Sequence, residues 1–245
     1  MQHPRMTILG DGHLGWAVAA AASERGQRTP VVGRPPGRRH DPTTFDGIDL
    51  VVDATVGPAV AGNVEAALDA GVRRFVIATT GWADDRDALD ARLRDAHAGA
   101  VVASNFSVGV ALFSRLVAVA SELFGATEGF DPYLVEWHRR GKADRPSGTS
   151  LELARQMVGR HPSVAAIDDL ELVSVRAGAS PGMHLVGFDA AGESIELRHT
   201  ARDRSAYAVG VLAATDWLTR APRAPGIHPF DPVIDELLAR PSIAA

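Results

Sequence analysis

The sequence feature that most constrains the fold is a glycine-rich turn near the N-terminus. The apolar run Met6-Thr7-Ile8-Leu9 leads into Gly10-Asp11-Gly12-His13-Leu14-Gly15, and an alanine-rich stretch at 16–25 follows. A Gly-x-Gly-x-x-Gly run between a strand and a helix is typical of dinucleotide-binding folds. The first glycine permits the tight turn, the second lets a pyrophosphate approach the backbone, and the third lets helix and strand pack closely. We therefore expect a strand, this turn and a helix to bind a dinucleotide.

Strand-like and helix-like segments alternate through the following residues. Apolar runs at 29–32, 49–55, 74–78 and 100–103 predict strands, and helical patterns separate them. This alternation indicates an α/β fold with a doubly wound parallel sheet. Such sheets bind ligands at the carboxyl ends of their strands. Here those ends carry small or hydroxyl residues, which are Thr55, Ala78, Thr79, Thr80 and Ser104.

The residues after the second strand bear on the choice of cofactor. A site specific for NAD usually offers an acidic residue about 20 residues beyond the glycines, to bind the ribose hydroxyls. This chain offers Arg34, with Arg38 and Arg39 close behind. Guanidinium groups suit a 2′-phosphate, so we predict NADPH in preference to NADH. The alternative is that these arginines only solubilise a proline-rich loop.

Charge and composition exclude several classes of function. The net charge of −5 argues against a general nucleic-acid binder. The absence of cysteine excludes disulfides and thiolate metal sites, and the nine histidines show no ligand-like spacing, so we expect no metal. The N-terminus lacks the apolar core of a signal peptide, and no run reaches 18 consecutive apolar residues. We expect a cytoplasmic protein without a membrane span.

The pattern changes in the second half of the chain. A helix at 110–124 is apolar almost all round, so it should be buried in the core or at a subunit interface. Strand-like runs at 133–135, 170–175, 184–188 and 194–198 follow. The last of these alternates apolar with charged residues, which predicts a sheet with one wet face. A helix around 207–218, a proline-rich tail at 221–232 and a short helix at 233–239 close the chain.

The stretch 136–150 gathers the residues with the most chemistry. It contains His138, four cationic side chains and the helix start Pro146-Ser147-Gly148-Thr149. Positive charge, a titratable imidazole and a helix N-terminus in one loop indicate an anion site with acid/base chemistry. The alternative is a solvated basic loop. The helix start favours the anion site, because a solvated surface loop does not need it.

These residues resemble the dihydrodipicolinate reductase family of the lysine pathway. The family signature reads His-His-x-x-Lys-x-Asp-x-Pro-Ser-Gly-Thr, and residues 138–149 here read His-Arg-Arg-Gly-Lys-Ala-Asp-Arg-Pro-Ser-Gly-Thr. Three further segments match in order: Thr79-Thr80-Gly81, Asn105-Phe106-Ser107-Val108-Gly109-Val110, and Arg176-Ala177-Gly178 with Gly182 and His184. The resemblance runs from Met6 to about Leu218.

The resemblance implies a division into domains. Residues 1–107 and 205–245 would form a Rossmann dinucleotide-binding domain, and residues 108–204 a second α+β domain with a mixed sheet. This second domain would bind substrate and form a homo-oligomer, a dimer or a tetramer. With the turn and the strand ends above, the expected cofactor-binding residues are Gly10, Gly12, His13, Leu14, Gly15, Arg34, Thr55, Ala78, Thr79, Thr80, Ser104, Asn105, Phe106 and Arg204.

The resemblance also assigns roles within the basic stretch, and elementary chemistry agrees with them. His138 and Lys142 fall on the acid/base positions, and Gly148 and Thr149 on the site for a substrate carboxylate. Hydride delivery to a cyclic imine leaves negative charge on the substrate, which a cationic acid such as Lys142 can quench by protonation. His138 would orient the substrate or relay the proton. For the dicarboxylate, Ser147 would cap the helix start and Arg139 would clamp a carboxylate as a bidentate fork.

Three departures from the family pattern concern the substrate. Arg139 replaces the second histidine, the loop after the second strand is short, and the acidic segment 166–169 stands in place of a long basic loop. The first hypothesis is therefore a reductase of 4-hydroxy-tetrahydrodipicolinate. The second is a paralogue that applies the same hydride chemistry to a different cyclic imine or unsaturated amino-acid precursor. The third is a non-catalytic nucleotide-binding regulatory protein.

Overall fold

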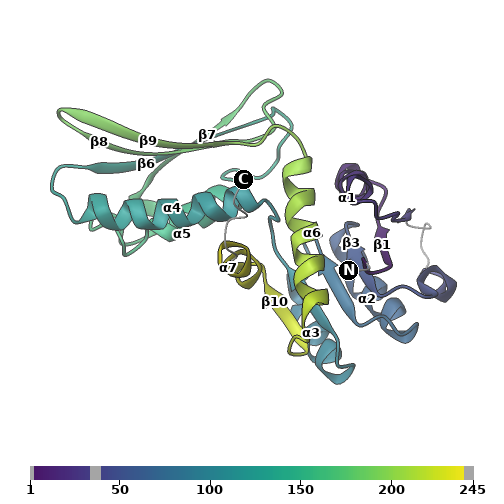
Figure 1. The fold of residues 1–245 in the computed structure, drawn as a ribbon. Helices are drawn as coiled ribbons and strands as arrows, with labels where there is room; N and C mark the ends of the chain where they lie inside the picture. The colour runs from purple at the N-terminus through teal and green to yellow at the C-terminus, as the bar shows by residue number, and fades with distance from the viewer. Residues whose placement is uncertain (1–2, 34–39, 240–245) are drawn as a thin grey trace. The chain divides into compact units, whose positions relative to one another are not determined.

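The chain folds into two compact units. The computed structural model describes residues 3–33 and 40–239. The first unit comprises Met1–Val108 and Arg204–Ala245, and the second comprises Gly109–Asp203. Figure 1 traces both, with the C-terminal segment returning to the first unit as helix α6 and strand β10.

The first unit is built on a parallel sheet with helices on both faces. Its described strands are β1 (Met6–Leu9), β2 (Val31–Val32), β3 (Leu50–Asp53), β4 (Arg74–Ile77), β5 (Gly99–Val102) and β10 (Gly226–Pro229), in the order β10-β5-β4-β3-β1-β2. Its helices are α1 (His13–Glu24), α2 (Val60–Asp69), α3 (Arg86–Asp95), α6 (Ser205–Arg220) and α7 (Asp231–Ala239). The predicted doubly wound parallel sheet is confirmed.

Burial on both faces explains why these strands are continuously apolar. Leu50, Val51 and Val52 in β3 are all buried, although neighbouring side chains of a strand point to opposite faces. Val51 packs in one core cluster with Val64 of α2 and Leu93 of α3. Helices α1 and α6 contact each other and pack against β1, β4 and β5.

Two sequence predictions for this unit were wrong in detail. The proline-rich tail contains strand β10, which pairs in parallel with β5. Proline is tolerated there because β10 is an edge strand, and Pro229 stands at its end. The second strand is short, with only Val31 and Val32 in the ladder. Arg34, Arg38 and Arg39 lie outside the described residues.

The second unit is a mixed sheet covered by helices. Strands β6 (Asp131–His138), β7 (Glu171–Arg176), β8 (Met183–Ala190) and β9 (Glu193–Thr200) run in the order β7-β6-β8-β9. Strand β7 is parallel to β6, and the other two pairings are antiparallel. Helices α4 (Val108–Gly125) and α5 (Gly148–Met157) share a core with the sheet through Phe113, Val117, Leu134, Leu153, Met157, Val186 and Phe188. The predicted mixed sheet is confirmed.

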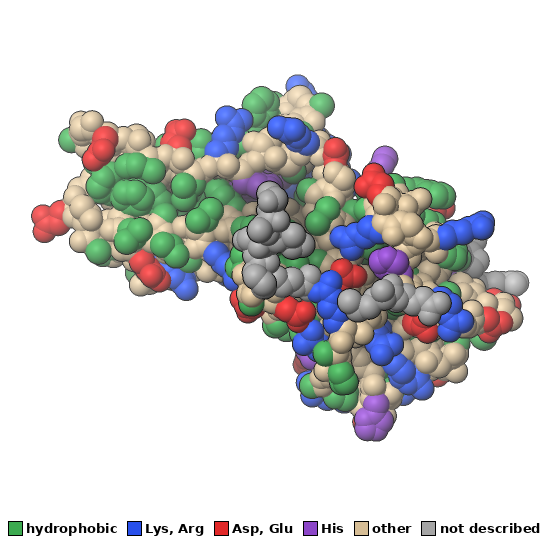
Figure 2. All heavy atoms as spheres, viewed as in Figure 1, with side chains coloured by type: hydrophobic (Ala, Val, Ile, Leu, Met, Phe, Trp, Pro, Cys, Tyr) green, Lys and Arg blue, Asp and Glu red, His purple; other side chains and the backbone are tan. Residues whose placement is uncertain are grey.

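This unit exposes two apolar surfaces. On α4, Val117 is buried, but Leu116, Val119 and Leu123 are each more than half exposed. Figure 2 shows hydrophobic side chains gathered over this part of the unit. By length and hydropathy alone α4 could span a membrane, with 22% of the helix buried in the unit. The helix is therefore not enclosed within its own chain.

The sheet face opposite the helices is the second apolar surface. The expected wet face holds for β9, where Glu196 and Arg198 are exposed. It holds only at the starts of β6 and β7, where Asp131 and Glu171 are exposed; further along these strands the exposed residues are Trp137, Val173 and Val175. Alternation in β9 alone could not reveal this difference, because each strand contributes its own residues to the shared face.

Candidate active site

The register of the first sheet aligns the predicted cofactor residues. Leu9 pairs with Asp53, Asp53 with Ile77, and Ile77 with Val102, so four parallel strands end at one level. The residues that follow them therefore lie at one edge of the sheet. These are Gly10, Gly12, Thr55, Ala78, Thr79, Thr80, Ser104 and Asn105.

The three glycines of the turn have different surroundings. Gly10 has a φ of +105°, and a Cβ there would collide with the Ala54 carbonyl. A Cβ on Gly15 would collide with the Gly10 carbonyl, so this glycine permits close packing of helix and turn. At Gly12, which precedes α1, a Cβ would meet no atom within 4 Å. Open space at a helix N-terminus fits the pyrophosphate of a dinucleotide.

A buried carboxylate holds two of the strand ends together. Asp53 accepts hydrogen bonds from the Thr55 backbone N–H at 3.0 Å and the Thr55 hydroxyl at 2.7 Å. It also accepts from the Thr79 hydroxyl and the Asn63 amide, both at 2.8 Å. The predicted residues Thr55 and Thr79 are thus fixed by Asp53, which sequence reasoning did not single out.

The remaining cofactor predictions have varied positions. His13 and Leu14 lie in the first turn of α1. Phe106 is buried, and its ring packs against Phe230 at a centroid distance of 5.0 Å, so the ring is part of the packed interior. Arg204 precedes α6 with its guanidinium 5.2 Å from the ring centroid of Tyr207.

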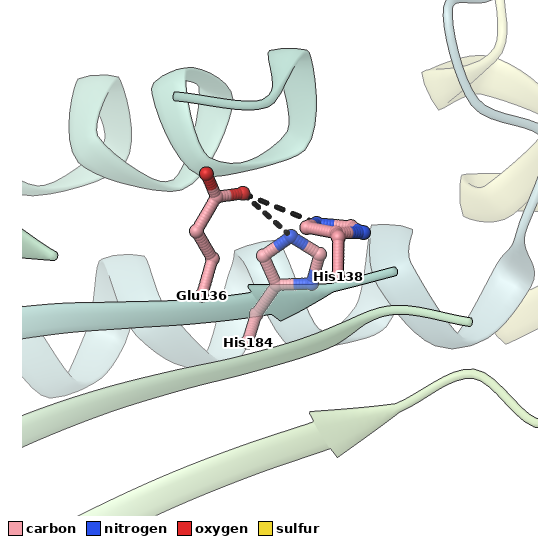
Figure 3. A group of neighbouring side chains, drawn as sticks. All are labelled: Glu136, His138 and His184. Carbon is pink, nitrogen blue, oxygen red and sulfur yellow. Dashed lines mark ion pairs between the residues drawn. The ribbon is translucent and has the colours of Figure 1, made fainter. Parts of the chain in front are cut away.

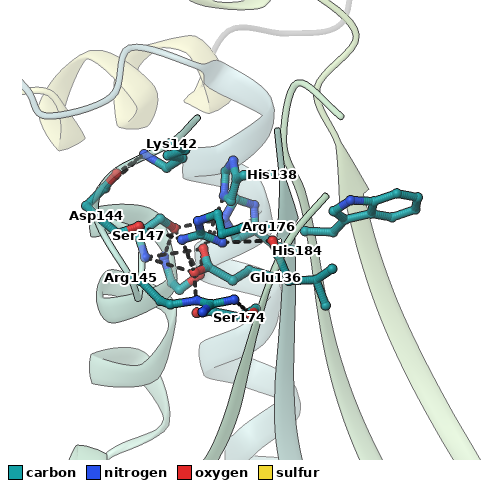
Figure 4. A network of polar contacts seen from close by, with 12 residues as sticks. Glu136, His138, Lys142, Asp144, Arg145, Ser147, Ser174, Arg176 and His184 are labelled. Atoms are coloured by element: carbon teal, nitrogen blue, oxygen red, sulfur yellow. Dashed lines mark hydrogen bonds and ion pairs between the residues drawn. The ribbon is translucent and has the colours of Figure 1, made fainter. Parts of the chain in front are cut away.

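In the second unit, strand pairing gathers a polar cluster on the helix-covered face of the sheet. Glu136 is paired across the ladder with Ser174 of β7 and with His184 of β8. His138, two residues further along β6, is paired with Arg176. Because residues i and i+2 of a strand share a face, these side chains converge (Figures 3 and 4).

Glu136 is the centre of this cluster. Its carboxylate is fully buried and accepts hydrogen bonds from the Ser147 backbone N–H at 3.0 Å, the Ser150 hydroxyl at 2.8 Å, the Ser174 hydroxyl and Arg176 Nη2 at 2.7 Å. Burial raises the pKa of Glu136, but these hydrogen bonds together outweigh it and hold the pKa well below its ordinary range. The group is an anion, and its charge is matched by Arg176.

Two buried histidines lie beside this anion. His138 Nε2 is 3.1 Å from Glu136 Oε2, an ion-pair distance, but its N–H is not aligned for a hydrogen bond. His184 Nε2 is 3.9 Å from the same oxygen. Burial lowers the pKa of His138, with Glu136 opposing and Lys142 and Arg176 adding to the effect. Burial also lowers the pKa of His184, to about 4, so both rings favour the neutral form at neutral pH.

Glu136, His138 and His184 also form a group whose potential ligand atoms lie within 4.8 Å of one another. Sequence spacing missed this group, because its members come from two strands. The carboxylate, however, already accepts hydrogen bonds at both oxygens, and one of its partners is the Arg176 cation. A second cation at this place would be repelled by Arg176, so the donor set does not fit a resident metal.

The loop after β6 carries the other predicted residues. Lys142 Nζ is 2.6 Å from Asp144 Oδ1, and the pair is partly exposed. Ser147 precedes α5, and its hydroxyl accepts a hydrogen bond from the Ser150 N–H at 3.2 Å, as expected of an N-cap. Gly148 and Thr149 form the first turn, and Arg139 is exposed.

The sequence interpretation assigned no role to Glu136, Ser174, Arg176 and His184, although it quoted Arg176 and His184 among the matching segments. One signal was present in the sequence: Glu136 and His138 follow Leu134 at every second position of a strand. A glutamate on a buried strand face requires donors, and the sequence does not say which residues supply them.

Comparison with known proteins identifies relatives over most of the chain. A family model described as dihydrodipicolinate reductase, C-terminus, matches residues 109–233. The 4-hydroxy-tetrahydrodipicolinate reductase of Methanopyrus kandleri is 36% identical over 206 residues, which is 79% of this chain and 74% of that protein. The enzyme of the same name from Methanoregula boonei is 33% identical over 196 residues, 76% of this chain and 74% of that protein.

Solved structures share the fold. A dipicolinate-bound dihydrodipicolinate reductase from Paenisporosarcina sp. TG-14 superposes with a TM-score of 0.73 at 20% identity, over 93% of this chain and 98% of that one. The two-unit architecture is therefore common to both proteins.

Proposed function

The chain belongs to the dihydrodipicolinate reductase family, and on that premise we propose that it is an NADPH-dependent 4-hydroxy-tetrahydrodipicolinate reductase of lysine (diaminopimelate) biosynthesis. One observation carries most of the proposal. A single strand–loop–helix segment presents His138 beside a buried anion, Lys142 on the loop, and the capped start of α5. An acid and an anion-binding helix start are what reduction of a cyclic imine dicarboxylate requires. The same proposal places the enzyme in the cytoplasm.

The substrate is held by its carboxylates. The N–H groups of Gly148 and Thr149 stand in the first turn of α5, where the helix dipole favours an anion. Ser147 caps this turn with its hydroxyl, and its own N–H is directed to Glu136. Arg139, exposed at the end of β6, would bind the other carboxylate with its two-pronged guanidinium.

Protonation is the chemical task of this chain's own residues. Gly10, Gly12, Gly15, Thr55 and Thr79 would hold the cofactor, and when bound the reduced nicotinamide supplies the hydride. Lys142 Nζ donates the proton that quenches the charge left on the substrate. His138 orients the substrate or passes a proton to Lys142. The preference for NADPH rests on the sequence position of Arg34.

The test is a coupled assay in which a synthase generates the substrate and NADPH oxidation is followed. We expect turnover by the wild type and a fall in kcat of about 100-fold or more in Lys142→Met. Arg140→Met removes an exposed cation two residues away and serves as the matched control. No turnover by a protein that still binds NADPH would contradict the proposal.

A paralogue with a different acid substrate is the second candidate. It is supported by Arg139, which stands where the family has a histidine, and by the short acidic turn at Ile167–Asp169 before β7. Thermal shifts with NADPH, NADH and pyridine-2,6-dicarboxylate separate the two candidates. Stabilisation by NADPH without any response to the dicarboxylate favours the paralogue. A non-catalytic regulatory role would be favoured instead if Lys142→Ala left the physiological role intact.

We also propose that the chain forms a homo-oligomer through its second unit. The support is the exposed apolar sheet face, with Trp137, Val173 and Val175, and the exposed face of α4. Monomeric proteins rarely leave such faces uncovered. Val175→Lys is expected to lower the mass measured by light scattering after size-exclusion chromatography, and an unchanged oligomer would exclude this sheet face.

A further inference from the structure

The buried carboxylate of Glu136 accepts hydrogen bonds from several groups in addition to the cation that balances its charge. Arg176 matches the charge directly, at 2.7 Å. The remaining donors come from Ser174 on β7 and from Ser147 and Ser150 at the start of α5. Glu136 thus joins two strands and the helix start that carries the proposed carboxylate site. Because it accepts the Ser147 N–H, it fixes the direction in which the first turn of α5 presents its other N–H groups.

The same carboxylate also constrains His138. A neutral imidazole carries its proton on one nitrogen and a lone pair on the other. Nε2 lies only 3.1 Å from Glu136 Oε2, so even without an aligned hydrogen bond the negative oxygen repels a lone pair on Nε2 and attracts a proton there. The proton therefore belongs on Nε2, and Nδ1 is left as the acceptor on the side that points away from Glu136 (Figure 3).

Two residues of the second unit pack around the His138 ring. A Cβ on Gly182 would lie 3.1 Å from His138 Cε1 and 3.3 Å from Nδ1, so the absence of a side chain at Gly182 leaves the space that the ring edge needs. The ring of His184 stands edge-on to His138 at a centroid distance of 5.1 Å. The charged groups around His138 are Glu136 on its own strand, Arg176 on β7 and Lys142 on the loop.

We propose that Glu136 is a positioning residue of the reductase, which keeps the proton of neutral His138 on Nε2, so that Nδ1 is a proton acceptor, and which sets the α5 N-terminus at the same time. This rests on the proposed function, since the Nδ1 acceptor serves the proton transfer there. A proton taken up at Nδ1 gives an imidazolium paired with Glu136, and it leaves again from Nδ1. Glu136 itself keeps its charge throughout and touches no substrate.

The test compares Glu136→Gln with Glu152→Gln, which makes the same change at an exposed glutamate of α5. In Glu136→Gln we expect kcat to fall by about 100-fold, with a smaller change in KM. Since the negative charge of Glu136 raises the pKa of His138, its removal shifts the acid limb of the kcat profile to lower pH. Glu136→Asp, which keeps the charge, should restore part of kcat. Glu152→Gln should match the wild type.

A second measurement does not depend on turnover. Long-range ¹H–¹⁵N correlation spectra of the full chain, assigned with His138→Gln, report which ring nitrogen carries the proton. The wild type should show Nε2–H, and Glu136→Gln a mixture. If Glu136→Gln fails to fold, the double variant with Arg176→Met removes the unpaired guanidinium and still lacks the carboxylate. The inference would be overturned if a folded variant without the Glu136 carboxylate kept the wild-type His138 tautomer, the wild-type acid limb of the pH profile and the wild-type kcat. If the wild type carries the His138 proton on Nε2 but reduces no substrate, the proposed function is contradicted, while the inference that Glu136 positions this proton is retained.

Discussion

Each unit buries one carboxylate at the place where its strands deliver ligand-binding loops, and the two are held differently. Asp53 ends β3 in the first unit, and its donors are two threonines and an asparagine, all neutral. Glu136 lies near the end of β6 in the second, and its neighbours include the Arg176 cation and two histidines. The donors to Asp53 are neutral groups, whereas the neighbours of Glu136 include a cation and two titratable rings, so the second network has more groups that can respond to protons. The first suits cofactor binding, and the second suits acid/base chemistry.

The largest difference should appear on removal of Arg176. Arg176→Met leaves Glu136 buried without its cation, which costs about 3–5 kcal/mol of the free energy of unfolding. Urea denaturation measures this value. Adding Glu136→Gln to Arg176→Met should recover part of the loss, because the buried charge is then gone. A cost below 1 kcal/mol would mean that the cation does not stabilise the network.

The pH dependence of unfolding should be the next largest effect. His184 has a pKa of about 4 in the folded chain against 6.5 ordinarily, so the unfolded chain binds the proton more readily. Its contribution to stability is complete above pH 6.5 and is lost as the pH falls to about 4, a loss of about 3 kcal/mol. The lowered pKa of His138 acts in the same direction.

Variants at two histidines test this sign. His184→Gln should reduce the slope of unfolding free energy against pH in that window. His97→Asn removes an exposed histidine of the first unit and controls for the loss of one imidazole. An unchanged slope in His184→Gln would show that the second network is no more responsive to protons than the first.

A smaller loss is expected at the neutral network. In Asp53→Asn the new amide group has to face a donor, either Asn63 or the hydroxyls of Thr55 and Thr79, so one hydrogen bond is lost. The cost should be about 1–3 kcal/mol, below that of Arg176→Met. Asp69→Asn, at an exposed aspartate of the same unit, is the matched control for urea denaturation. A larger cost than that of Arg176→Met would reverse the comparison.

The smallest effect belongs to an exposed pair of the same chemistry. Lys142 and Asp144 are 2.6 Å apart, but the carboxylate is about half exposed. Asp144→Asn should change the free energy of unfolding by less than about 1 kcal/mol, because solvent screens the pair. Thermal unfolding at low and high salt measures both the change and the screening. If Asp144→Asn lowered the free energy of unfolding as much as Arg176→Met does, burial would not explain the difference between the Lys142–Asp144 and Arg176–Glu136 pairs.

Much of this architecture could be predicted from the sequence, for physical reasons that differ between the units. The first sheet follows from local signals, since alternating elements and the Gly10 turn require nothing distant. Strand β10 was missed because an edge strand can carry Pro229, which normally argues against a strand. Positions 138 and 142–149 were available from the signature. The pairing of Glu136 with His184 was not, because it depends on the register of two strands far apart in sequence.

The exposure of α4 shows a different kind of limit. Its all-round apolar pattern predicted burial or a subunit interface, and Leu116, Val119 and Leu123 are exposed in the single chain. An apolar sequence indicates that a surface is unfavourable in water, but it does not identify the molecule that covers that surface.

The parallel pairing of β6 with β7 has a consequence for how this protein can change. Parallel neighbours require a crossover, and residues 139–147 with α5 are part of that crossover. The segment 139–147 is anchored at both ends: the ladder holds His138 before it, and Glu136 binds the Ser147 N–H at its end. Between these anchors, Arg139, Arg140 and Gly141 are exposed. Under the proposed function, exchange of Arg139, Arg140 and Gly141 would alter which acid is bound, while the strand and helix that flank the segment keep their anchors.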